Sequence, residues 1–198
     1  WKIAPALAYG NTVVFKPAEL VPGCAWVLAE IISRSGLPAG AFNLVLGSGR
    51  RVGQTIVESP LVDAISFTGS VPVGEALLAT ATARRARVQL EMGGKNPLVV
   101  LADAALERAV EHAIQGAFYS TGQRCTASSR IIVEAPVFDR FASLMRQRTA
   151  ALVVGHALER GTQIGPVVSA DQLAQDLSYV DIGRSEGAEW LCGGEALE

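Results

Sequence analysis

The sequence predicts an α/β fold, in which a parallel sheet carries helices on its faces. Three observations lead to this prediction. Short runs of β-branched and aromatic residues recur along the first half of the chain, a glycine turn follows most of them, and a segment with apolar residues at helical spacing comes next. Strand, turn and helix in repeated order are typical of βαβ units, whose strands lie parallel.

The composition excludes several classes of protein. The chain has 198 residues, with 17 Lys and Arg against 19 Asp and Glu, so its formal net charge is −2. Hydrophobic residues make up 49% and the mean hydropathy is +0.30, which is too apolar for an intrinsically disordered segment. No basic excess is present to bind nucleic acid, and Gly and Pro interrupt the uncharged stretches before they reach the roughly 18 residues of a membrane span. We therefore expect one or two globular domains, with neither nucleic acid nor membrane as a partner.

The elements of the first half follow in chain order. Strands are predicted over residues 12–15, 42–46, 64–67 and 87–91. Helices are predicted from Pro22 to Ser35, over 52–57 and over 73–81. The apolar face of the first of these helices is expected to comprise Cys24, Val27, Leu28, Ile31 and Ile32.

The repeated order of strand, glycine turn and helix ends at Gly93-Gly94, which we take as a domain boundary between residues 1–93 and 94–198. A strand over 97–101 is expected to lead into an amphipathic helix over 106–118, with Asp103 as its N-terminal cap. The other predicted elements are a strand over 130–134, a helix through 138–152, a helix over 171–186 and a short strand over 190–192.

Two glycine turns lie between a predicted strand and a predicted helix. They read Gly47-x-Gly49-x-x-x-Gly53 and Gly69-Ser70-x-x-x-Gly74. Backbone N–H groups at the start of a helix favour a phosphate, but neither turn has the G-x-G-x-x-G spacing, so an ordinary βα turn is the alternative.

Lys16 and Glu19 follow the first strand, where ligands of parallel sheets collect. They are candidates for binding a ribose, the alternative being solvated charges.

One of the three cysteines has a sequence context that differs from that of the other two. Cys24, Cys125 and Cys192 are an odd number without CxxC or histidine spacing, so we expect no disulfide framework, no metal site and a reducing, cytoplasmic location. Cys24 and Cys192 are predicted to be buried packing residues. Cys125 has polar neighbours and follows Arg124, a context that favours a reactive thiolate. It is a candidate nucleophile, with a packing role as the alternative.

Two further charged residues have two interpretations each, and an arginine cluster has one. Glu91 ends a predicted strand before two glycines, so it is either a general base or a carboxylate in a salt bridge. Arg124 either meets a substrate carboxylate or forms a structural ion pair. The cluster Arg84, Arg85 and Arg87 is interpreted as a solvated turn.

Five segments together resemble the aldehyde dehydrogenase superfamily over essentially the whole chain, in the order and spacing of that family. The segments are Trp1-Lys2-Ile3-Ala4-Pro5-Ala6-Leu7, Gly10-Asn11-Thr12-Val13-Val14-Phe15-Lys16-Pro17-Ala18-Glu19, Phe67-Thr68-Gly69-Ser70-x-x-x-Gly74, Leu90-Glu91-Met92-Gly93-Gly94-Lys95-Asn96-Pro97 and Gly122-Gln123-Arg124-Cys125. The resemblance implies a Rossmann-like cofactor domain followed by part of an α/β catalytic domain.

The resemblance also implies roles. Cys125 matches the nucleophile, which forms a thiohemiacetal and then a thioester, and Glu91 matches the general base. Lys16 and Glu19 match residues that hold the adenosine ribose of NAD or NADP. Ser70 matches a residue near the pyrophosphate, with Gly69 and Gly74 shaping that turn. The substrate would be a small aldehyde. The sequence around Cys125 is similar to that of bacterial semialdehyde dehydrogenases, among them the α-ketoglutaric semialdehyde type.

Two alternatives to the hydrolytic enzyme remain open. A CoA-acylating relative would resolve the thioester with CoA, although such relatives generally lack the glutamate that Glu91 matches. A non-catalytic nucleotide-binding or structural homologue would not need Cys125 and Glu91 in matching contexts. Glu19 would accept from a free 2′-hydroxyl and repel a 2′-phosphate, which favours NAD. A surface glutamate can also rotate away from a 2′-phosphate, so NADP stays open.

The chain resembles the middle of an enzyme more than twice as long, expected to be a homodimer or homotetramer. The family's oxyanion-hole asparagine, its nicotinamide-ribose glutamate and a dimer-forming segment would lie outside this chain. Because loss of one oxyanion donor alone costs roughly 10²–10³ in rate, we expect the isolated chain to be inactive, and also poorly soluble.

Overall fold

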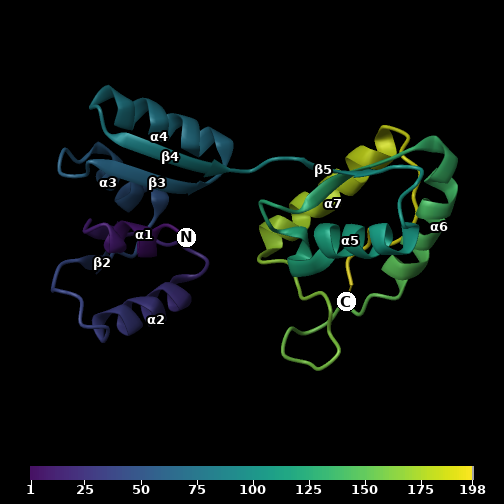
Figure 1. The fold of residues 1–198 in the computed structure, drawn as a ribbon, viewed down its shortest axis with the longest axis horizontal. Helices are drawn as coiled ribbons and strands as arrows, with labels where there is room; N and C mark the ends of the chain where they lie inside the picture. The colour runs from purple at the N-terminus through teal and green to yellow at the C-terminus, as the bar shows by residue number, and fades with distance from the viewer. Residues whose placement is uncertain (198) are drawn as a thin grey trace. The chain divides into compact units, whose positions relative to one another are not determined.

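A computed structural model describes residues 1–197 and divides the chain into two compact units, Trp1–Gly93 and Gly94–Glu198 (Figure 1). The fold is α/β with parallel strand pairs, as predicted. Among the residues described, no helix combines the length and apolarity needed to cross a membrane.

The first unit contains two parallel strand pairs, β1 with β2 and β3 with β4. In chain order its elements are α1 (Ile3–Ala8), β1 (Val13–Phe15), α2 (Pro22–Ser33), β2 (Phe42–Leu44), the π-helical turn η1 (Gly49–Gly53), α3 (Gln54–Glu58), β3 (Ala64–Gly69), α4 (Val71–Ala83) and β4 (Arg87–Met92). Parallel neighbours need a crossover, and α2 and α4 supply one for each pair. The carboxyl ends of paired strands therefore lie at a common edge.

The second unit is built around one parallel pair, β5 with β6. Its elements are β5 (Asn96–Val100), α5 (Leu106–Phe118), the 3₁₀ turn η2 (Tyr119–Gly122), β6 (Ser128–Val133), α6 (Ala135–Ala150) and α7 (Ala170–Ser185). The predicted amphipathic helix is confirmed, because its apolar face packs into the core. That core comprises Val100, Leu106, Val110, Ala113, Ile114, Phe141 and Met145.

Two local predictions in the second unit are wrong. Asp103 does not cap α5, because the chain stays extended through Ala105 (ψ 90°) and the cap position falls there, without a side-chain hydrogen bond. Residues 190–192 form no strand and pair with none of the strands described; the positive φ values of Gly193 (73°) and Gly194 (78°) end the extended backbone directly after them.

The expected burial of Cys24 and of its helix face is also wrong. Cys24 is exposed and Cys192 is half-buried. In α2 the buried residue is Ala25, whereas Trp26 is 63% and Ile31 is 56% exposed. Since α2 is apolar on more than one side, periodicity could not identify the face that packs within this chain; the small Ala25 permits the closer approach.

The interpretation of the arginine cluster as a solvated turn fails for Arg84. Arg84 follows the end of α4, and its half-buried guanidinium donates to the carbonyl oxygens of Val57 at 2.9 Å and Val62 at 2.6 Å. Val57 lies in the last turn of α3, whose carbonyls have no partner within the helix. Arg84 therefore ties α4 to α3 and to the loop before β3.

Replacing Arg84 with methionine should lower the free energy of unfolding by about 2 kcal/mol, because two carbonyls lose a charged donor. Urea unfolding followed by circular dichroism measures this change. The matched control is Arg85→Met, at an exposed neighbour, expected to change stability by less than about 0.5 kcal/mol. An equal loss in both variants would contradict the role of Arg84.

Candidate active site

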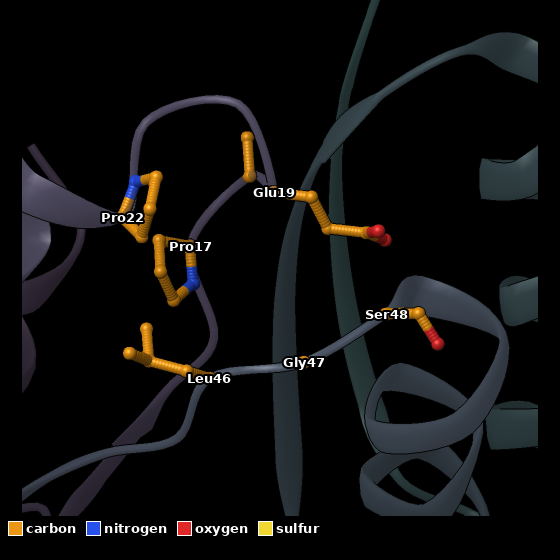
Figure 2. A pocket seen from close by; sticks show the side chains of 7 residues that line it. Pro17, Glu19, Pro22, Leu46, Gly47 and Ser48 are labelled. Atoms are coloured by element: carbon orange, nitrogen blue, oxygen red, sulfur yellow. The ribbon is translucent and has the colours of Figure 1, made fainter.

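A cavity of about 250 Å³ lies where β1 and β2 end. Pro17, Pro22 and Leu46 form an apolar side, and the carboxylate of Glu19 and the hydroxyl of Ser48 lie on the other side (Figure 2). Its residues come from the segments that follow two adjacent parallel strands. The arrangement offers an apolar surface for a flat ring and a carboxylate acceptor for hydroxyl groups.

Glu19 is fixed in this cavity by a backbone hydrogen bond. Its Oε1 accepts from the N–H of Gly49 at 2.8 Å, at the start of η1. The structure thus joins Glu19 to the first glycine turn, Gly47-Ser48-Gly49, which sequence spacing left open between a phosphate-binding turn and an ordinary βα turn. The cavity-lining residues Pro22, Leu46 and Ser48 were not predicted; the parallel pairing of the two strands is the signal that could have indicated them.

Lys16 lies directly after β1, but its amine does not reach Glu19. Its Nζ donates to the carbonyl oxygen of Pro17 at 2.7 Å, and its aliphatic stem lies near Gly53. Lys16 and Glu19 are therefore neighbours at one strand end without forming an ion pair in the part of the chain that is described.

The second glycine turn is the entry to α4. β3 continues through Gly69, two residues beyond the predicted end of this strand at Phe67, and Ser70 occupies the helix N-cap in extended conformation (ψ 152°). The Ser70 side chain makes no capping hydrogen bond, so the first N–H groups of a 13-residue helix are left for another acceptor, which the helix dipole favours as an anion.

Gly74 allows α4 to lie close to β4. A Cβ atom at this buried position would overlap the Sδ of Met92, so any side chain would displace the helix or the methionine. Gly69 pairs with Met92 in the β3–β4 ladder, and Thr68 pairs with Glu91. Glu91 and the start of α4 consequently share the carboxyl edge of this strand pair.

The carboxylate of Glu91 is accessible on β4. Its side chain is 59% exposed and lies 3.8 Å from the amine of Lys2, and Gln89 Nε2 donates to its Oε1 at 3.3 Å. An ion pair this exposed contributes little to stability. The carboxylate is thus available to accept a proton from a water molecule.

Cys125 lies in a tight turn between η2 and β6. The N–H of Ala127 donates to the carbonyl oxygen of Arg124 at 3.0 Å and closes this turn around Cys125 and Thr126. The preceding residues Ser120, Thr121 and Gly122 all have positive φ, of 56°, 55° and 66°. For two of them this is an unfavourable backbone conformation, of the kind that concentrates at functional sites.

The guanidinium of Arg124 is engaged with the end of α5. Its Nη2 donates to the carbonyl oxygen of Gln115 at 2.7 Å and, more weakly, to that of Gly116 at 3.4 Å. These carbonyls belong to the last turn of α5, which cations stabilise. The interpretation as an ion pair is wrong, since the partners are neutral carbonyls.

Asn96 is a site residue that sequence reasoning missed. Its Nδ2 donates to the carbonyl oxygen of Cys125 at 2.7 Å and to that of Ala127 at 3.1 Å. Asn96 begins β5 and pairs with Ser128, at the start of β6. Asn96 belongs to one of the five family segments, but nothing in the sequence indicates that it meets Cys125, because 29 residues separate the two.

The candidate residues are distributed over both units. Glu19, Ser70 and Glu91 lie in the first unit, and Cys125 lies in the second. Within residues 1–197, no three His, Cys, Asp or Glu side chains group closely enough to hold a metal ion.

The model of the aldehyde dehydrogenase family matches residues 1–198. The chain belongs to the aldehyde dehydrogenase family. It is 51% identical to an α-ketoglutaric semialdehyde dehydrogenase of Bacillus subtilis, covering 100% of this chain and 41% of that protein. It is 45% identical to a betaine aldehyde dehydrogenase of Sinorhizobium fredii, over 98% of this chain and 40% of that protein.

Solved structures of the family agree with this membership. An NADP-dependent enzyme of Escherichia coli superposes with a TM-score of 0.97 at 40% identity, over 100% of this chain and 41% of that one. A betaine aldehyde dehydrogenase of Staphylococcus aureus in complex with NAD⁺ superposes with a TM-score of 0.97 at 36% identity, over 100% and 39%. The chain therefore spans about two-fifths of the length of these relatives.

Proposed function

We propose that the protein containing this chain oxidises an aldehyde to a carboxylic acid, with a nicotinamide cofactor and a covalent intermediate on Cys125. The observation that carries the proposal is the accessible Cys125 in a turn fixed from both sides, by Asn96 and by Arg124, in a chain of the aldehyde dehydrogenase family. The first unit is proposed as the cofactor-binding part and the second as the part that supplies the nucleophile.

The residues of the first unit fit the adenosine half of a nicotinamide cofactor. The apolar side of the cavity, at Pro17, Pro22 and Leu46, suits the adenine ring, and the Glu19 carboxylate suits the ribose hydroxyls. Lys16 would supply a further donor to the ribose once its amine leaves the Pro17 carbonyl. The start of α4, where the Ser70 side chain makes no capping hydrogen bond, suits the pyrophosphate.

The chemistry follows from the side chains of two residues. The Cys125 thiolate attacks the aldehyde carbon and forms a C–S bond, which places a negative charge on the former carbonyl oxygen. A bound nicotinamide cofactor would supply the hydride acceptor needed to convert this thiohemiacetal to a thioester. Glu91 then takes a proton from water, whose oxygen attacks the thioester carbon; the C–S bond breaks, the acid leaves and the thiolate is restored.

A semialdehyde is the proposed substrate class. The support is the 51% identity to an α-ketoglutaric semialdehyde dehydrogenase, compared with 45% to a betaine aldehyde dehydrogenase, whose named substrate carries a positive charge. Arg124 gives no support, because its guanidinium is engaged with α5.

We expect the full-length protein, as a homodimer or homotetramer, to have a higher kcat/KM for α-ketoglutaric semialdehyde than for betaine aldehyde. The reverse order of kcat/KM would contradict the choice of a semialdehyde.

Replacing Glu19 with glutamine should relax the preference for NAD over NADP. The amide oxygen still accepts from Gly49, but the charge that repels a 2′-phosphate is lost, so we expect the Kd for NADP to fall about tenfold, the effect of roughly 1.4 kcal/mol. Quenching of tryptophan fluorescence measures both dissociation constants on the full-length protein. Glu30→Gln, at an exposed carboxylate of α2, is the control and should change neither.

Replacing Glu91 with glutamine should separate the two halves of the reaction. We expect kcat to fall by about 10²–10⁴, the usual contribution of a general base, while the first turnover still releases one equivalent of reduced cofactor and leaves a thioester on Cys125. Stopped-flow absorbance and intact-protein mass spectrometry measure these two quantities.

The control for this experiment is Glu111→Gln on the exposed side of α5, which should leave kcat unchanged. Unchanged turnover in Glu91→Gln would contradict the role of Glu91. Turnover that requires added CoA would favour the CoA-acylating alternative, and a protein that turns over no aldehyde at all would favour the non-catalytic one.

A further inference from the structure

The turn that carries Cys125 is held by one side-chain amide from another strand. Asn96 Nδ2 has two hydrogens, and both are used, one on the carbonyl oxygen of Cys125 at 2.7 Å and one on that of Ala127 at 3.1 Å. Asn96 is half-buried, which reduces competition from water. A single planar amide therefore fixes two carbonyls of the turn with respect to β5.

These bonds determine the orientation of successive peptide planes around the nucleophile. The Arg124 carbonyl accepts from the Ala127 N–H at 3.0 Å, which fixes the plane that also carries the N–H of Cys125. The Asn96 bond to the Cys125 carbonyl fixes the next plane. With the planes on both sides of its Cα constrained, the Cys125 side chain can vary only by rotation about its own χ1.

The strand pairing keeps Asn96 in place. β5 and β6 pair in parallel, Asn96 lies opposite Ser128, and the register shifts between Asn96 and Pro97. This irregularity puts the start of β5 beside the segment that enters β6, which is the segment after Cys125. Gly116 of α5 adds to the closeness, because a Cβ there would lie 2.6 Å from the Ser128 hydroxyl.

We propose that Asn96 is the positioning residue of the nucleophile, holding the Arg124–Ala127 turn so that the Cys125 thiol is presented in one orientation. Asn96 contacts no reacting atom in this role. The inference rests on the proposed function of Cys125, and it identifies a residue that acts on the rate of the covalent step through backbone carbonyls.

The test compares Asn96→Asp and Asn96→Ser with the unaltered full-length protein. Aspartate has the same shape but directs a carboxylate oxygen at two carbonyl oxygens, so both bonds are lost; serine keeps one donor. We expect kcat to fall about 10²-fold in Asn96→Asp and about tenfold in Asn96→Ser, because small displacements of a reacting group have effects of this order. The KM for the cofactor should change less than about twofold, since the proposed cofactor residues lie in the other unit.

A second readout does not depend on aldehyde oxidation. Hydrogen–deuterium exchange of the unliganded protein should show that the Ala127 amide, which closes the turn, exchanges about tenfold faster in Asn96→Asp than in the unaltered protein, with β3 and β4 unchanged. Because this measurement needs neither substrate nor cofactor, it tests whether Asn96 holds the turn separately from whether Cys125 is the nucleophile.

Asn43→Asp is the matched control. Asn43 Nδ2 also donates to two backbone carbonyls, of Gly40 at 2.8 Å and Val13 at 3.3 Å, but in the first unit. We expect this variant to lose stability without a comparable loss of kcat. Equal losses of kcat in the Asn43 and Asn96 variants, or unaltered exchange at Ala127 in Asn96→Asp, would overturn the proposal. If Asn96→Asp does not fold, Asn96→Ser gives the same two measurements.

Discussion

Parallel pairing of neighbouring strands is the constraint on which the other features of this chain depend. A parallel pair has both carboxyl ends at one edge and both amino ends at the other, and it requires a crossover of helix or loop between its strands. In the first unit this puts the segment after β1, with Glu19, beside the segment after β2, with Gly49. In the second unit it puts the start of β5, with Asn96, beside the entry to β6, after Cys125.

Polar side chains bound to backbone carbonyls are the second recurring feature. Arg84 holds the end of α3, Arg124 holds the end of α5, and Asn96 holds the nucleophile turn. In each case the donor satisfies carbonyls that secondary structure leaves without a partner, at a helix end or in a turn. These residues connect packing to function, since the elements they fix carry the proposed nucleophile or support the proposed cofactor site.

The predictions from sequence succeeded where the signal was local. The strands and most helices were located within a few residues, because β-branched runs and helical spacing reflect the chain's own geometry. The cap at Asp103 failed because the helix begins two residues later, with Ala105 at the cap position. The strand at 190–192 failed because a strand needs a pairing partner elsewhere in the chain, and two glycines with positive φ follow it. The packing face of α2 failed because several of its faces are apolar.

The sequence by itself determined the α/β class, the family resemblance and the identity of the candidate residues, above all Cys125 and Glu91. These inferences need only the types of residues and their order along the chain. Only the tertiary structure decided which groups those residues meet. Glu19 meets the Gly49 amide, Arg124 meets α5 rather than a carboxylate, and Asn96 meets the Cys125 turn. The physical reason is that hydrogen bonds between segments far apart in the chain depend on strand register and helix packing, which leave no periodic pattern in the sequence.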